Sequence, residues 1–177
     1  MHVTFKRTGA HRYAVIVSHE GRVAQSIHPA PGYDDHIPHD LVHYVVEAEL
    51  RLQAGVFGRA ARGGGTFISD TDTTSSARDR ARQRRKQLRK EASLGARDRD
   101  DELHHSERLA ALCDVAWRKQ HGQRPDPLRK APEGSPEDAV QIERVVTRLN
   151  QLAPLWRALP IDGELTFEWP STAPRGS

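Results

Sequence analysis

The sequence is poor in the residues that form covalent cross-links and membrane spans. Cys113 is the only cysteine, so no disulfide can form within the chain, which fits a reducing cytosol. No apolar run approaches the roughly 20 residues needed to cross a bilayer, and Met1-His2-Val3 leads into a strand pattern rather than a signal peptide. These absences predict a cytoplasmic protein with no membrane partner.

Apolar residues are scarce for a chain of this length. Only 36% of the 177 residues are hydrophobic, 29% are charged, and the net charge is +3. The chain is long enough for one domain with a real core, but part of it must lie outside that core. We therefore expect a single α+β domain over residues 1–177, with a polar, arginine-rich excursion, flexible or helical, over residues 62–100.

Strand patterns occur at both ends of the chain. Three closely spaced ones begin the sequence, at residues 2–7, 12–18 and 22–28. Short turns between them are typical of an antiparallel meander, and the second strand, apolar at successive positions, is expected in the middle. Near the other end, Leu165, Phe167 and Trp169 alternate with polar residues, which predicts a C-terminal strand in the same sheet.

Helical periodicity appears in the remaining apolar segments. Helices are expected at residues 38–54, around the stripe at 109–117, at 135–152, and more briefly at 56–61. Gly55 is expected to end the first helix. Pro154 is expected to kink or end the last one, leaving Leu155, Trp156 and Leu159 to cover the sheet. The predicted fold is a small antiparallel sheet, made of the meander and the C-terminal strand, with three to four helices on one face.

Metal-ligand residue types and a strong helix coincide between residues 32 and 54. His39 and His43 stand one turn apart on one helix face, so their Nε atoms can converge on one cation at about 2.0–2.1 Å. The pair predicts a site for zinc or another divalent metal. The candidates for further ligands are Asp34, Asp35 and His36 before the helix and Asp70 and Asp72 after it.

His39-Asp40-Leu41-Val42-His43 resembles the HExxH helix of zinc metallopeptidases. In this HDxxH motif, Asp40 stands where that family has its general-base glutamate. The resemblance implies a metal-dependent hydrolase, with Asp40 or Glu47 as the base or as support behind the ligands. The chain departs from the extended metzincin pattern, which would need glycine and histidine where Val46 and Glu49 stand.

The same helix is followed by Gly55-Val56-Phe57-Gly58, and the chain ends in a strand that contains tryptophan. Together these features resemble a group of small, uncharacterised bacterial proteins. The resemblance covers about the first third of the chain and its last twenty residues. It implies a shared fold unit and supplies no reaction.

Other hydrolytic chemistries find less support in the sequence. An HD-type phosphohydrolase would use His39-Asp40 as its central pair, but it needs ligands on separate helices, and the chain before His36 has the pattern of strand and loop. Cys113 sits on an apolar helix stripe, and no serine lies in a nucleophile-elbow context.

Residues 77–91 carry ten charges, eight of them basic, and one large apolar residue, Leu88. A helix this polar cannot bury a face, so we expect it to project into solvent or to be disordered. The alternative to a metal protein is thus a non-catalytic interaction module in which this segment contacts nucleic acid or an acidic protein partner. Its candidate contact residues are Arg78, Arg82, Arg85, Lys86 and Arg89.

Overall fold

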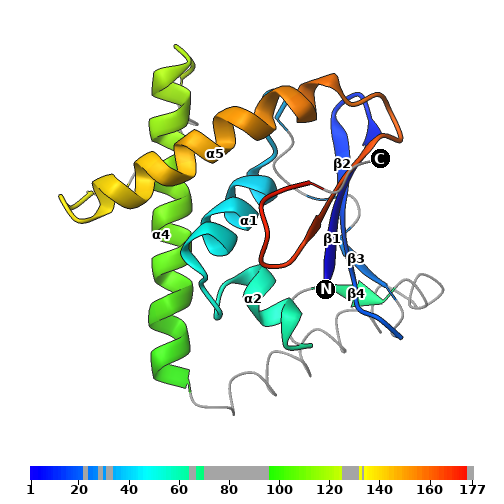
Figure 1. Ribbon diagram of the computed structural model, residues 1–177, viewed down its shortest axis with the longest axis horizontal. Coiled ribbons are helices and arrows are strands. Elements are labelled where there is room, and N and C mark those ends of the chain that lie inside the picture. Colours follow the sequence, from blue (N-terminus) through cyan, green and yellow to red (C-terminus); the bar gives the residue numbers. More distant parts are fainter. Residues whose placement is uncertain are drawn as a thin grey trace.

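The computed structural model describes residues 1–21, 24–27, 30, 34–63, 67–69, 96–124, 132 and 134–174. Over these ranges the chain forms one antiparallel sheet with helices on one side of it (Figure 1), so the predicted α+β class is confirmed. Most of the predicted excursion, with all of residues 70–95, lies outside the described residues. The predictions for the basic segment therefore stay predictions.

Five antiparallel strands form the sheet in the order β4-β3-β2-β1-β5. Their bounds are β1 His2–Gly9, β2 Arg12–Ser18, β3 Gln25–Ile27, β4 Ile68–Ser69 and β5 Glu164–Glu168. The meander and the C-terminal strand are confirmed, and β2 is the middle strand as predicted. Strand β4 was not predicted, because two residues are too few to leave a periodic pattern in a sequence.

The register of the strands gathers their apolar side chains on one face. Val3 of β1 lies opposite Val17 of β2 on one side and Phe167 of β5 on the other. Directly opposite residues share a face of a sheet, and all three of these side chains are buried. Phe5 repeats the pattern two residues along β1 and supplies the centre of the core.

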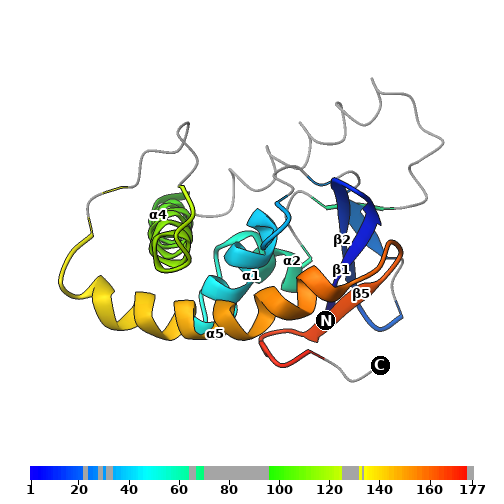
Figure 2. The same ribbon diagram turned by 90° about the horizontal axis from the view of Figure 1, so that it is seen from above.

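Helices cover this face in two layers, as Figure 2 shows from above. Helix α1, His39–Leu50, lies on the sheet, with the rings of Tyr44 and Phe5 in edge-to-face contact. Helix α5, Asp138–Ala158, brings Trp156 against Tyr13 of β2.

Helix α4, Ala96–Gln120, packs on α1 and α5 and forms the layer away from the sheet, whereas we expected it on the sheet face. The reason lies in α1, whose residues from position 41 to 48 are all buried. Helix α4 covers the side of α1 that faces away from the sheet. None of the described helices combines the length and the apolar character needed to cross a bilayer.

Two predicted helix ends differ from the structure. Helix α1 ends at Leu50 and not at Gly55, because the next residue, Arg51, adopts a left-handed conformation with φ 56°. Helix α5 continues through Pro154 to Ala158. Trp156 is buried as expected, but Leu155 is 43% exposed and does not cover the sheet.

Gly55 instead precedes helix α2, Val56–Ala61, and allows a carboxylate of α1 to reach that helix. Glu47 Oε1 accepts a hydrogen bond from the N–H of Val56 at 2.8 Å, and Oε2 accepts from Phe57 and Gly58 at 2.9 and 3.1 Å. A Cβ at position 55 would lie 2.2 Å from the Glu47 carboxyl carbon. Only glycine leaves room for this contact.

Replacing Gly55 by alanine should therefore destabilise the protein, because the new methyl group would displace the Glu47 carboxylate from the first turn of α2. We expect a loss of about 1–3 kcal/mol in the free energy of unfolding, measured by urea denaturation. Gly9→Ala is the matched control, since a Cβ there meets its nearest neighbour at 3.6 Å. Equal stability of the two variants would contradict this role of Gly55.

Candidate functional site

His39 and His43 meet at their Nε2 atoms, which lie 2.9 Å apart. The two rings are edge to face, with centroids 4.4 Å apart. In this arrangement one Nε2–H donates to the lone pair of the other ring. Two nitrogens at this separation, each at about 2.05 Å from a metal, would subtend roughly 90° at it, which suits neighbouring positions of a five- or six-coordinate ion. For the tetrahedral angle of about 109°, the two Nε2 atoms would have to lie about 3.3 Å apart, so the rings would have to separate slightly.

Glu107 of α4 approaches this pair across the contact between α1 and α4. Its Oε2 lies 3.7 Å from His43 Nε2. The Glu107 side chain is 54% exposed, so it can change rotamer, whereas the His43 side chain is 6% exposed and fixed by packing. Among the described residues, no group of three or more His, Cys, Asp or Glu side chains already surrounds one point closely enough to hold a metal. The arrangement is thus a pair of imidazole nitrogens with a movable carboxylate beside it.

Sequence reasoning missed Glu107. It lies 64 positions after His43, in a charged stretch before the apolar stripe of α4, and only the packing of two helices brings it to the pair. The signal that could have indicated it is the pair Val46 and Leu50, which lies on the same side of α1 as the histidines. Apolar residues on that side predict that another helix packs there.

The two carboxylates predicted as bases are directed elsewhere. The Tyr13 hydroxyl of β2 donates to Asp40 Oδ2 at 2.6 Å, which holds this carboxylate on the sheet side of α1. Glu47 uses both of its oxygens for α2 and also accepts a hydrogen bond from Ser106 Oγ at 3.3 Å. Both residues therefore have structural partners, Asp40 on β2 and Glu47 on α2 and α4.

Burial dominates the electrostatics of Glu47, which has no exposed surface. Desolvation raises the pKa of this carboxyl group to about 7, while its hydrogen bonds from Gly58, Phe57, Val56 and Ser106 act in the opposite direction. The group thus titrates near neutrality inside the helix layer.

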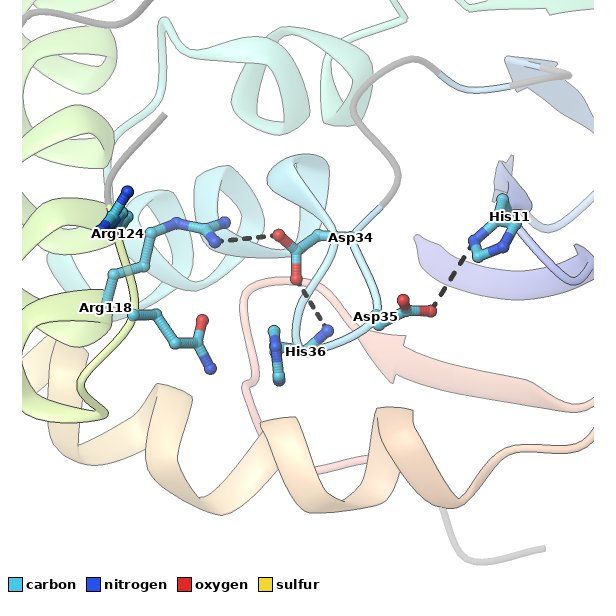
Figure 3. A pocket seen from close by; sticks show the side chains of 7 residues that line it. His11, Asp34, Asp35, His36, Arg118 and Arg124 are labelled. Carbon is cyan, nitrogen blue, oxygen red and sulfur yellow. Dashed lines mark hydrogen bonds and ion pairs between the residues drawn. The ribbon is translucent and has the colours of Figure 1, made fainter. Parts of the chain in front are cut away.

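The predicted loop ligands Asp35 and His36 line a separate pocket of about 480 Å³ (Figure 3), whose walls include neither His39 nor His43. Asp35 Oδ1 lies 3.9 Å from Nδ1 of His11, in the turn between β1 and β2. The structure therefore brings the two helical histidines together but not the loop residues with them. Asp70 and Asp72 lie outside the described residues.

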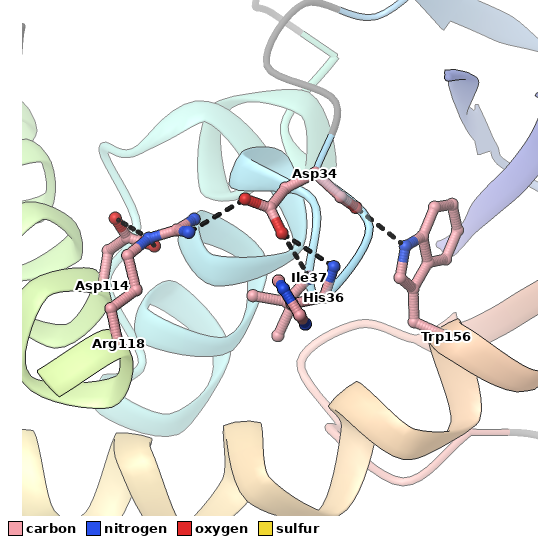
Figure 4. A network of polar contacts seen from close by, with 6 residues as sticks. All are labelled: Asp34, His36, Ile37, Asp114, Arg118 and Trp156. Carbon is pink, nitrogen blue, oxygen red and sulfur yellow. Dashed lines mark hydrogen bonds and ion pairs between the residues drawn. The ribbon is translucent and has the colours of Figure 1, made fainter. Parts of the chain in front are cut away.

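Asp34, at the edge of the same pocket, ties the loop before α1 to α4 (Figure 4). Its Oδ1 accepts the N–H groups of His36 and Ile37 at 2.7 and 3.3 Å, and its Oδ2 accepts from Arg118 Nη1 at 2.9 Å. Arg118 Nε also donates to both oxygens of Asp114, at 3.1 and 2.9 Å. Burial would raise the pKa of Asp34, but its bonds from His36, Arg118 and Ile37 together lower it.

Cys113 is no nucleophile in this setting. Burial, together with the negative charges of Asp114 and Asp138, raises the pKa of its thiol to about 12. The thiolate, the reactive form, is therefore absent at neutral pH.

Comparisons of the chain with protein families, curated proteins and solved structures gave no match. The resemblances to the HExxH helix and to small bacterial proteins stay predictions that rest on the residues alone. The candidate nucleic-acid residues between 78 and 89 lie outside the described residues, so their predicted role also stays a prediction.

The pKa of Glu47 predicts a pH-dependent stability. Because the folded value of about 7 lies above the unfolded value of 4.5, the carboxyl group adds stability below pH 4.5, and this contribution is lost as pH rises through 7. Its contribution to the free energy of unfolding should fall by about 2 kcal/mol between pH 5 and pH 7.5.

Glu47→Gln, which cannot titrate, should lack this component when urea denaturation curves at the two pH values are compared. The difference between wild type and variant isolates the contribution of Glu47 from those of all other groups. If the two proteins change equally with pH, the carboxyl group does not titrate in this window.

Proposed function

We propose that the protein binds a divalent transition metal, zinc in the first instance, through His39 and His43 on α1, with Glu107 of α4 as the third ligand. The observation that carries the proposal is the 2.9 Å approach of the two Nε2 atoms on one face of a packed helix. Imidazole nitrogen suits zinc, copper, iron and nickel, whereas magnesium and calcium prefer oxygen ligands.

Glu107 supports the proposal through its position and its charge. Its Oε2 lies 3.7 Å from His43 Nε2, and a rotamer change of this half-exposed side chain moves the carboxylate onto a metal held by the pair. Two imidazoles and one carboxylate leave at least one coordination position for water, the ligand number of catalytic rather than structural zinc sites.

The proposed function is metal binding and includes no catalysed reaction. A hydrolase of the HExxH type needs a base at the metal, and both predicted bases are engaged elsewhere, Asp40 with Tyr13 and Glu47 with α2. The interaction-module alternative depends on residues 78–90, and no contact of the described residues favours it. The single, buried Cys113 supports a cytoplasmic location, where thiols stay reduced.

Zinc should raise the stability of the wild-type protein measured by thermal denaturation. A ligand that binds only the folded state adds about 2.7 kcal/mol at a hundredfold excess over Kd. For a chain of this length that corresponds to a rise of roughly 5–10 °C in Tm. The His39→Ala/His43→Ala variant should fold and lose this rise, whereas His121→Ala, which removes an exposed histidine after the end of α4, should keep it.

If zinc raises the Tm of the double variant as much as that of wild type, zinc binds elsewhere in the protein. Because coordination needs both imidazoles neutral, the zinc affinity measured by calorimetry should also fall between pH 7.5 and pH 5.5.

Glu107→Gln tests the third ligand separately, because it keeps the size of the side chain and removes its charge. We expect a loss of about tenfold or more in zinc affinity by calorimetry, with unchanged stability of the metal-free protein. The control is Glu137→Gln, since Glu137 is an exposed residue just before α5. Wild-type affinity in Glu107→Gln would limit the site to the two histidines.

A further inference from the structure

The pocket that holds Asp35 and His36 is unusual in having only polar side chains in its walls (Figure 3). They come from four places in the chain: His11 between β1 and β2, residues 34–36 before α1, Arg118 of α4, and Gln123 and Arg124 just after it. Its volume of about 480 Å³ is in the range of small-molecule sites, but most such sites are lined mainly by apolar groups. Walls of this kind suit a small, strongly polar ligand.

Most of the charges in these walls are matched by other protein groups. Arg118 is shared between the carboxylates of Asp34 and Asp114, and Asp34 also accepts two backbone N–H groups. Asp35 stands beside His11 at 3.9 Å. These groups hold one another in place, as Figure 4 shows for Asp34 and Arg118.

Three polar groups of the same walls are left over. Arg124, which is exposed, makes no hydrogen bond or ion pair with any other described residue. Nδ1 of His36 and Oε1 of Gln123 are buried atoms that have no hydrogen-bond partner within the described part of the chain. Buried polar atoms in folded proteins are nearly always paired, and unpaired ones mark places where a water or ligand completes the bonding.

We propose that this pocket binds a small molecule through an oxyanion, the phosphate or carboxylate group of a metabolite. Arg124 supplies the charge, because a guanidinium binds the paired oxygens of these groups with two parallel hydrogen bonds. His36 and Gln123 complete the bonding of the oxyanion and of a neighbouring hydroxyl or amino group. The two guanidinium groups in the walls disfavour a metal cation here, so this pocket is distinct from the histidine pair.

Calorimetry with inorganic phosphate and with succinate, each against sodium chloride of equal ionic strength and with EDTA present, tests the proposal. We expect saturable binding of at least one of the two anions by the wild-type protein and none of chloride. Binding of phosphate alone assigns a phosphate ester as the ligand class, and binding of succinate alone assigns a carboxylate. EDTA keeps the result independent of any metal at His39 and His43.

Arg124→Gln should weaken the binding about tenfold or more, because it removes a charge-assisted pair of hydrogen bonds from an exposed position where folding is unaffected. Arg157→Gln, an exposed arginine near the end of α5, is the matched control and should bind as wild type does. His36→Asn should weaken binding as well, by a smaller factor. The proposal is overturned if neither anion binds saturably, or if Arg124→Gln binds as tightly as Arg157→Gln.

Discussion

The carboxylate of Glu47 has no exposed surface, yet it accepts hydrogen bonds from three successive backbone N–H groups of α2 and from Ser106 of α4. Removing a carboxylate from water is costly, and this one is tolerated because four donors replace its hydration. Three helices therefore share one polar contact inside an otherwise apolar layer. Glycine at position 55 is the condition for it, since any side chain there would fill the space that the carboxylate occupies.

The candidate metal centre depends on this contact. Ser106 and Glu107 are neighbours on α4, so the bond that fixes Ser106 to Glu47 also fixes the place from which Glu107 reaches His43. Glu47, which resembles a catalytic base in the sequence, thus serves the candidate site indirectly, by fixing the position of the helix that carries the proposed third ligand.

Sequence patterns predicted most of the fold, because alternation and helical periodicity follow directly from which side of an element is buried. Val3 and Phe167 illustrate this on the strands. Strand β4 was missed, since its two residues owe their conformation to pairing with β3 and not to a pattern of their own. The sequence predicts a helix end at Gly55, because nothing in the local pattern reveals how close Glu47 comes to that residue.

Only those residues of the candidate site that lie close together in the sequence could be predicted to meet. His39 and His43 share one helical turn, so their meeting follows from spacing alone. Asp40 and Glu47 lie close to them in sequence, but their directions are decided by Tyr13 and by the first turn of α2, which are distant contacts. Glu107 comes from a different helix and could not be found from spacing at all.

Helices α1 and α4 run antiparallel, and paired contacts mark their alignment from end to end: Glu47 with Ser106, His43 with Glu107, and Asp34, just before α1, with Arg118. A slide of α4 by one helical turn, about 5.4 Å, would break all of these pairs together. The proposed metal would bind Glu107 of α4, and the proposed anion would bind Arg124 just after α4, so each would favour this single alignment. Thermodynamic reciprocity would then make the proposed metal at one end and the proposed anion at the other cooperative, although the two share no ligand residue.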